Sequence, residues 1–185
     1  MQIAIIIIIS LIFIMGLLFI SSYNKLAKTR SKVENSWGQI NVQLKMRADL
    51  VPNIVETVKG YAKHEQETLT KVMEARNQFM SAKTPEDTMN SASQMKGIMG
   101  RLFAVAEEYP ELKANQNYLN LQEQLGEIEN KITMYRQFYN DTVMLYNRLI
   151  ITFPKNIFAS ILGFEELPYF QIDDGERSAP KVNFN

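Results

Sequence analysis

Residues 3–20 of the chain read IAIIIIISLIFIMGLLFI, eighteen residues without a charged side chain. As an α-helix, a segment of this length extends about 27 Å, close to the roughly 30 Å thickness of a bilayer's hydrocarbon core. A buried helix of a small globular domain would show a polar face, and this segment has none. The sequence therefore predicts a membrane-spanning helix within an anchor over residues 1–22.

A cleaved signal peptide is the competing interpretation of the same segment. Such a peptide has a basic region before the apolar run, a shorter apolar core and a cleavage site made of small residues. No lysine or arginine precedes the run, and Ile20-Ser21-Ser22-Tyr23 is a poor cleavage site. We therefore expect an anchor.

The residues just after the apolar run include several that are positively charged, and the first acidic residue is Glu34. These membrane-proximal basic residues are Lys25, Lys28, Arg30 and Lys32. They are compatible with an ordinary solvated helix face. By the positive-inside rule they predict a single-pass protein whose amino terminus lies outside and whose remaining chain lies in the cytoplasm.

Composition excludes several classes of function. The 185 residues include 20 basic and 20 acidic side chains, so no net charge would attract nucleic acid. Cysteine is absent, which excludes disulfides and thiolate chemistry, and His64 is the single histidine. No catalytic constellation, cofactor motif or metal site is recognisable, and we expect none. His64 is expected to be an exposed or capped helix residue.

The chain from Tyr23 to about Ala82 is predicted to form a first long helix, because apolar residues recur in steps of three, four and seven. Pro52 should kink it or interrupt it briefly. The first part of its apolar stripe, which we call the bundle seam, comprises Val33, Trp37, Ile40 and Leu44. Trp37 lies about 25 Å beyond Ile20 along a helix, so it is expected to be a core residue and not a membrane-interface residue.

A turn and a second helix follow. Thr84 suits the N-cap position, Pro85 the first helical position, and Glu86 with Asp87 the positive end of the helix dipole. Proline at 110 should end this helix near Glu108. Gly97 and Gly100 lack side chains and are expected to permit close helix approach.

A third long helix is predicted from about Glu111 to Thr152, with apolar residues stepping by four and three as in a coiled coil or bundle. This part of the bundle seam comprises Leu121, Leu125, Ile128, Ile132, Tyr135 and Tyr139. Polar residues beside it, such as Arg136, Asn140 and Asn147, are expected to fix register. Its partner should be the first long helix, antiparallel within the chain or across protomers.

The end of the chain leaves two interpretations open. Residues 155–164 can form a short helix that either closes the open end of the bundle or lies in the lipid interface. Residues 165–185 resemble an acidic irregular tail. The predicted fold class is therefore all-α: a transmembrane helix continuing into a long antiparallel helical bundle over residues 23–164, with three long helices plus a short C-terminal helix.

Several ordered segments resemble the LemA family of bacterial membrane proteins. They are VENSW at 33–37, VQLKMRADLVPN at 42–53, VETVKGY at 55–61, AEEYPELKAN at 106–115, YRQFYND at 135–141 and PKVNF at 180–184. The resemblance covers essentially the whole chain. It implies an amino-terminal anchor followed by an antiparallel helical bundle, and it implies no catalytic residues. Family relatives are associated with membrane organisation, including magnetosome membranes, and some are encoded beside membrane proteases.

Two functions are compatible with these observations. The first is a structural protein of the bacterial inner membrane that forms a homo-oligomer and organises or remodels the lipid bilayer as a scaffold. The alternative is an adaptor whose tail or bundle groove docks another membrane protein, such as a protease or a sensor. The expected partners are lipid and a second copy or a membrane protein, with no nucleic acid, and an enzyme is not expected.

Overall fold

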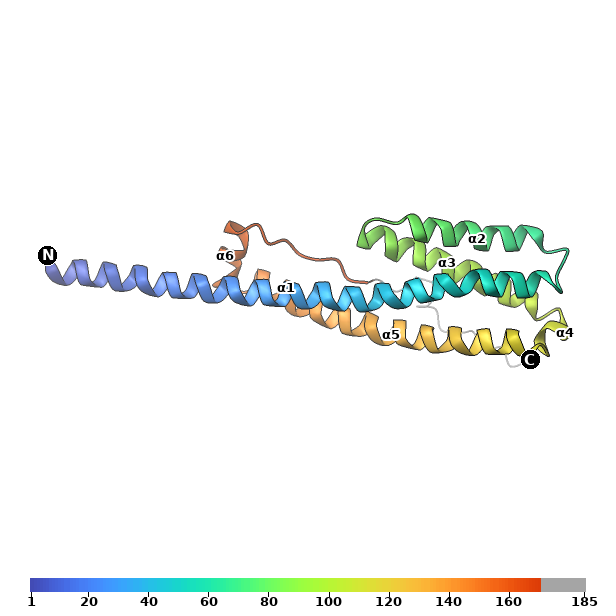
Figure 1. Ribbon diagram of the computed structural model, residues 1–185. Helices are drawn as coiled ribbons and strands as arrows, with labels where there is room; N and C mark the ends of the chain where they lie inside the picture. The colour runs from blue at the N-terminus through green and yellow to red at the C-terminus, as the bar shows by residue number, and fades with distance from the viewer. Residues whose placement is uncertain (171–185) are drawn as a thin grey trace, which may run out of the picture. The chain divides into compact units, whose positions relative to one another are not determined.

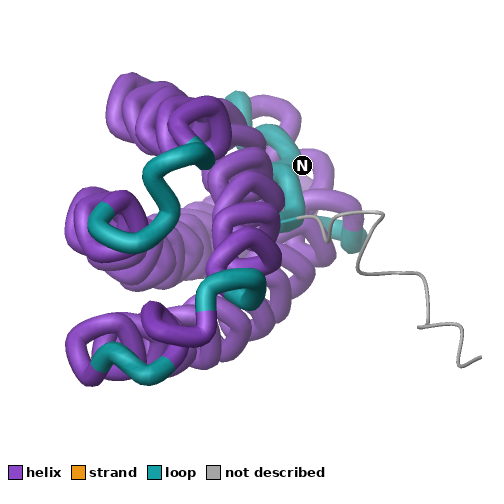
Figure 2. The backbone as a smooth tube through the Cα atoms, turned by 90° about the vertical axis from the view of Figure 1, so that its right-hand side faces the viewer, coloured by secondary structure: helices purple, strands orange, loops and turns teal. Residues whose placement is uncertain are grey.

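The computed structural model describes residues 1–170, whose regular structure consists of helices joined by loops and turns (Figures 1 and 2). The helices are α1 (Gln2–Lys59), α2 (Gln66–Ser81), α3 (Pro85–Ala106), α4 (Pro110–Lys113), α5 (Gln116–Ile151) and α6 (Lys155–Ile161). The predicted all-α class is confirmed. Residues 171–185 of the predicted tail lie outside the described residues.

The chain divides into two compact units. Unit 1 contains residues 1–38 and 137–169, so it comprises the first part of α1, the end of α5, α6 and the segment after it. Unit 2 contains residues 39–136 with Phe170. It is an antiparallel bundle of the end of α1, α2, α3 and the beginning of α5, with α4 at a turn (Figure 1).

Helix α1 runs without interruption for 58 residues and contains Pro52. The prediction of one long helix from Tyr23 to about Ala82, with a kink or a short break at Pro52, was wrong about its extent: the helix continues through Pro52 and ends at Lys59. The chain turns at residues 60–65 instead, where Tyr61 and Ala62 both donate to the carbonyl of Val58. The apolar pattern conceals this turn because Val58 and Leu69 are eleven residues apart, about three helical turns, so the stripe stays in phase across the loop.

The predicted third helix is also divided. Its first residues form the short helix α4, and α5 begins separately at Gln116. The side-chain oxygen of Asn115 accepts a hydrogen bond from the Tyr118 amide at 3.1 Å. This is the usual role of an N-cap asparagine, which satisfies one of the free amides at a helix start.

The predicted start of the second helix is confirmed in α3. Thr84 is the N-cap, and its hydroxyl accepts from the Asp87 amide at 3.1 Å. Pro85 occupies the first helical position, with Glu86 and Asp87 in the first turn. The helix ends at Ala106, two residues before the predicted position.

Each unit has its own apolar core. In unit 2 the buried side chains line the facing sides of the bundle: Ile40, Leu44, Val51, Ile54, Val58, Leu69, Val72, Phe79, Met95, Met99, Leu102, Leu112, Tyr118, Leu125, Ile128 and Ile132. In unit 1 they are Leu26, Val33, Tyr139, Val143, Tyr146, Phe158 and Ala159. Both sets follow the helical periods of three and four that a buried face requires.

The end of α6 is fixed by a glycine. Gly163 has a φ of +69°, a conformation in which a side chain would be strained. Its amide donates to the Ser160 carbonyl, and the Phe164 amide donates to the Ala159 carbonyl at 3.0 Å. These are the two hydrogen bonds of a Schellman motif, and they turn the chain so that the Phe164 ring lies 6.3 Å from the Tyr23 ring.

Candidate functional site

The beginning of α1 is an apolar helix whose side chains no other described residue buries. Every residue from Met1 to Ser21 is exposed, and an eighteen-residue window reaches a mean hydropathy of 3.3. By length and composition this helix can cross a membrane. The first buried residues are Ser22 and Leu26, so α1 changes from an exposed apolar helix to a packed helix within one or two turns.

The predicted membrane-proximal basic residues follow this transition. Lys25, Lys28, Arg30 and Lys32 are all exposed. Arg30 forms an exposed ion pair with Glu34 one turn later, with Nε 3.3 Å from Oε1. These positive charges are therefore available to solvent or to lipid headgroups beside the apolar segment.

The bundle seam residues belong to both units. Those that are buried are Val33, Ile40, Leu44, Leu125, Ile128, Ile132 and Tyr139, and those that are half-buried are Trp37, Leu121 and Tyr135. Gly97 and Gly100 are exposed on α3, and a Cβ atom at either would meet nothing within 4 Å. Neither glycine therefore serves a close helix approach among residues 1–170, and their role between two copies stays a prediction.

In unit 1, α1 and α5 are joined by a buried polar contact and an aromatic contact. The hydroxyl oxygens of Ser36 and Thr142 lie 3.0 Å apart, and both residues are buried. Trp37 follows Ser36 directly on α1, Tyr139 lies one turn before Thr142 on α5, and the rings of Trp37 and Tyr139 are 5.8 Å apart. Each hydroxyl also lies 2.8 Å from a carbonyl oxygen of its own helix, Ser36 from Val33 and Thr142 from Tyr139, so a shift of register would lose the contact between the helices but would leave neither group without a partner.

Residues 165–170, which we call the strap, follow α6 without regular structure. The Asn147 side chain forms two hydrogen bonds with the backbone of Leu167 in the strap. Its Nδ2 donates to the Leu167 carbonyl and its Oδ1 accepts from the Leu167 amide, each at 2.9 Å. The Tyr139 hydroxyl donates to the Pro168 carbonyl at 3.0 Å. In unit 2, the Arg136 guanidinium lies 4.7 Å from the centre of the buried Phe170 ring. Two of the residues expected to fix helix register, Asn147 and Arg136, thus contact the strap.

Burial affects two tyrosines of unit 1. Burial raises the pKa of the Tyr139 phenol above its ordinary 10.0, so this group stays protonated and donates to the strap at neutral pH. Burial also raises the pKa of Tyr146, whose hydroxyl has no partner among residues 1–170. Arg30 partly opposes that rise, whereas Glu34 and Glu165 add to it.

Replacing Asn147 by alanine is expected to release the strap. The change removes both hydrogen bonds to Leu167 and should cost roughly 1–3 kcal/mol of stability. Hydrogen–deuterium exchange of the full chain in detergent should show faster exchange of the Leu167 amide. The matched control is Gln137→Ala, an exposed position of the same helix, and equal protection of Leu167 in both variants would contradict this role of Asn147.

Unit 2 contains a buried charge on α1. Arg47 is 2% exposed, although arginine is almost never fully buried unless it is paired. Its Nη1 lies 3.0 Å from Oε1 of Glu129 on α5, and its Nη2 donates to the Ala92 carbonyl on α3 at 2.7 Å. Its Nε has no partner among the described residues. One side chain thus connects three helices of the bundle.

A second arginine of unit 2 compensates for the proline inside α1. Pro52 has no amide hydrogen, so the Ala48 carbonyl, four residues earlier, lacks its helical donor. Nε of Arg76 on α2 donates to that carbonyl at 3.0 Å. Arg76 also lies 4.0 Å from the carboxylate of Asp49. The segment RADLVP at 47–52 therefore supplies the polar contacts that join α1 to the other helices of unit 2.

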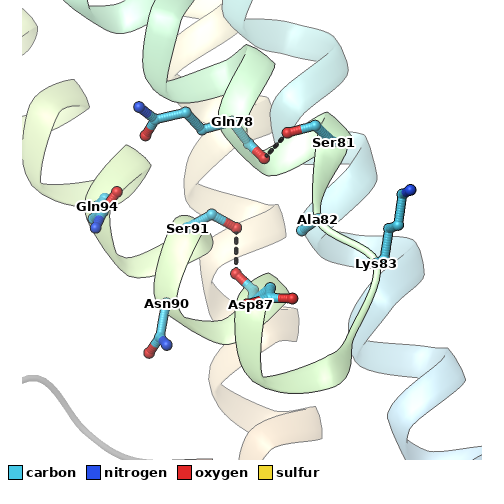
Figure 3. Close-up of a pocket in the computed structure, with 8 residues that line it drawn as sticks. All are labelled: Gln78, Ser81, Ala82, Lys83, Asp87, Asn90, Ser91 and Gln94. Carbon is cyan, nitrogen blue, oxygen red and sulfur yellow. Dashed lines mark hydrogen bonds between the residues drawn. The ribbon is translucent and has the colours of Figure 1, made fainter.

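An open pocket of about 390 Å³ lies at the turn between α2 and α3 (Figure 3). It is lined by Gln78, Ser81, Ala82, Lys83, Asp87, Asn90, Ser91 and Gln94. The Ser81 hydroxyl donates to the Gln78 carbonyl and the Ser91 hydroxyl to the Asp87 carbonyl, at 2.9 and 2.7 Å. Since both hydroxyls are bonded to their own helices, we assign no ligand to this pocket.

The described part of the chain contains no cluster of side chains that could bind a metal ion. Residues 1–170 hold no group of three or more histidine, aspartate or glutamate side chains placed to bind a metal ion. His64 is exposed in the turn between α1 and α2, not in a helix as expected. The candidate functional features are therefore the apolar surface of α1, the strap contacts in unit 1 and the arginine contacts in unit 2.

Comparison with known proteins finds a family model and several individual proteins that match this chain. A model of the LemA family matches residues 36–184. Protein LemA of Metamycoplasma hominis is 26% identical over 160 residues, covering 86% of this chain and 73% of that protein. Magnetosome protein MamQ 2 of Paramagnetospirillum magneticum is 38% identical over 73 residues, 40% of this chain and 27% of that protein. Magnetosome protein MamQ of Magnetospirillum gryphiswaldense is 32% identical over 72 residues, 39% of this chain and 26% of that protein.

Proposed function

Because this chain belongs to the LemA family, as its sequence segments predict, we propose that it is a membrane-anchored structural protein that self-associates and organises the bacterial inner membrane. The anchor is the apolar surface of α1, which supplies membrane association. The relatives named as magnetosome proteins support a role at a membrane, although the similarity spans only about a quarter of their length.

The observation that carries the self-association proposal is a pair of apolar residues on α5 that residues 1–170 leave exposed. In unit 1, Phe138 and Leu145 are 52% and 49% exposed. They are seven residues apart and so lie on the same side of the helix. The buried Thr142 lies on that side between them, one turn from each, and the buried residues Tyr146 and Val143 lie further round the helix. An exposed aromatic and an exposed leucine aligned along one helix are typical of a helix-to-helix contact.

Helix α1 connects the part of unit 1 that would form such contacts to the membrane anchor. It continues from the apolar anchor into the packed part of unit 1 without a break at residues 20–33. A continuous helix has no flexible joint, so packing of neighbouring copies through α5 would constrain the tilt of their anchors. Aligned anchors of many copies would impose order or curvature on the lipid.

The proposed orientation places the amino terminus outside and both units in the cytoplasm. It is supported by the exposed membrane-proximal basic residues, since lysine and arginine are enriched on the cytoplasmic side of membrane spans. Protease added to intact spheroplasts should therefore leave both units undigested. Digestion of the units under those conditions would reverse the orientation.

Replacing both Phe138 and Leu145 by glutamate tests self-association. Each apolar side chain contributes about 1.5–3 kcal/mol when fully buried, so the double variant should weaken association about 100-fold or more. The full chain in a mild detergent would be measured by light scattering, with Met80→Glu as the control at an exposed apolar residue of α2. Liposomes carrying each protein would be imaged for curvature.

The outcomes separate the two functions. A monodisperse monomer in the wild type, together with undistorted liposomes, would refute the scaffold. A monomer that crosslinks in the membrane to a different protein at equal stoichiometry would favour the adaptor instead. In that case, removal of residues 165–185 should abolish the crosslink.

A further inference from the structure

The α5–α6 corner, residues 151–161, exposes large apolar side chains. Ile151, Phe153, Ile157 and Ile161 are 64%, 75%, 48% and 71% exposed. Ile157 and Ile161 are one turn apart on α6, so they share a side of that helix. A water-facing side of a short surface helix would normally carry polar residues.

The other side of α6 fixes the position of this corner. Phe158 and Ala159 are buried, and the Phe158 ring lies 5.6 Å from the Phe19 ring in an edge-to-face arrangement at 83°. Phe164, just after the helix, contacts Tyr23. Both contacts lie within unit 1, and Figure 1 shows α6 beside α1.

The contact with Phe19 determines the depth of the corner in a membrane. Phe19 is the second-last residue of the apolar run, about 1.5 Å along the helix axis from its end at Ile20. A helix packed on the last turn of a membrane span lies at the boundary between hydrocarbon and headgroups. The exposed side of α6 then continues the lipid-facing surface of the anchor.

Charges and aromatic rings near the corner suit the same environment. Arg148 is exposed in the last turn of α5, and Lys25 and Lys28 are exposed on α1 beyond the apolar run. Tyr23, whose ring contacts that of Phe164 just after α6, is about half exposed. Cationic side chains bind lipid phosphates, and tyrosines are enriched at membrane interfaces.

We propose that the α5–α6 corner is a second membrane-contact surface, which inserts Ile151, Phe153, Ile157 and Ile161 into the interface beside the anchor. The two interpretations of residues 155–164 are then both partly correct: one side of α6 packs on the protein, and the other side faces lipid. This surface would hold the packed part of unit 1 close to the bilayer and restrict rotation of the anchor. The proposal requires the anchor but does not require self-association.

The absence of cysteine from the sequence allows a direct test. Single cysteines replacing Ile157 and Ile161 would carry a nitroxide label in the full chain, one copy per nanodisc of phosphatidylethanolamine and phosphatidylglycerol. Collision rates with oxygen, which partitions into lipid, would be compared with those of a water-soluble nickel chelate. Phe13→Cys in the anchor gives the lipid reference, and Met80→Cys on α2 gives the water reference.

The ratio of oxygen to nickel collisions at positions 157 and 161 is expected to be several-fold higher than at position 80 and to approach that at position 13. A ratio equal to that at position 80 would overturn the proposal. Labels shielded from both reagents would also overturn it, because a protein segment and not lipid would then cover the corner. Since each nanodisc holds one copy, failure of self-association leaves the result unaffected, and the label at position 13 reports on the anchor separately.

Discussion

Arg47→Ala is expected to lower the free energy of unfolding by about 3–5 kcal/mol, because it truncates a large buried side chain and leaves a buried carbonyl short of a donor. The change leaves the Ala92 carbonyl without its second donor and opens a cavity between three helices. Glu129 is less affected, because 31% of its side chain is exposed and water can solvate its carboxylate. Most of the expected loss therefore comes from the carbonyl and the cavity.

Chemical unfolding of the full chain in detergent, followed by circular dichroism, measures this loss. Lys71→Ala is the matched control, because Lys71 forms an exposed ion pair with Glu67 in the same unit and should cost less than about 1 kcal/mol. Arg47→Met keeps much of the volume without the charge and should cost less than Arg47→Ala. If Arg47→Ala and Lys71→Ala destabilise the protein equally, Arg47 does not hold the bundle together.

Arg76→Ala is expected to cost roughly 1–3 kcal/mol, because it leaves the Ala48 carbonyl without a donor in the middle of a helix. The structure predicts that this cost depends on Pro52. With alanine at position 52, an amide hydrogen is available to the Ala48 carbonyl, and the arginine becomes less necessary. The cost of Arg76→Ala should therefore fall by about 1 kcal/mol in the Pro52→Ala background.

A double-mutant cycle measures this dependence. Free energies of unfolding would be determined for both single variants and for the double variant. A control cycle would pair Pro52→Ala with Gln78→Ala, an exposed position two residues along the same helix, and should be additive. Additivity in the Arg76 cycle as well would mean that the arginine does not compensate for the proline.

The sequence predicted most of the fold because helical periodicity and end signals are local. The steps of three and four in the apolar residues locate the packed faces, and the Thr84-Pro85 pair locates the start of α3. The turn at residues 60–65 could not be predicted in this way, since Val58 and Leu69 remain in phase with each other across it. The separate start of α5 depends on a hydrogen bond from the Tyr118 amide to the Asn115 side chain. A pattern of apolar residues carries no information about this polar contact.

The polar contacts were harder to predict than the helices. Arg47 had a signal that was not used: it continues the alternation of Ile40, Leu44, Val51 and Ile54 and so occupies a buried position of the stripe. Its partners Glu129 and Ala92 could not be identified, because they are distant in sequence and one of them is a main-chain carbonyl. The same is true of the strap, whose contacts with Asn147 involve the Leu167 backbone.

The Ser36–Thr142 pair has a consequence for how the protein is made. These residues are 106 positions apart, and residues 39–136, which belong to unit 2, lie between them in the sequence. During synthesis the anchor and the first part of α1 emerge long before the residues that cover Leu26 and Val33. The contact between Ser36 and Thr142 can form only after residue 142 has been synthesised, whereas the residues of unit 2 up to Arg136 are made before it. Unit 1 is therefore completed last, and a nascent or truncated chain that ends before Thr142 presents an uncovered apolar face next to the membrane.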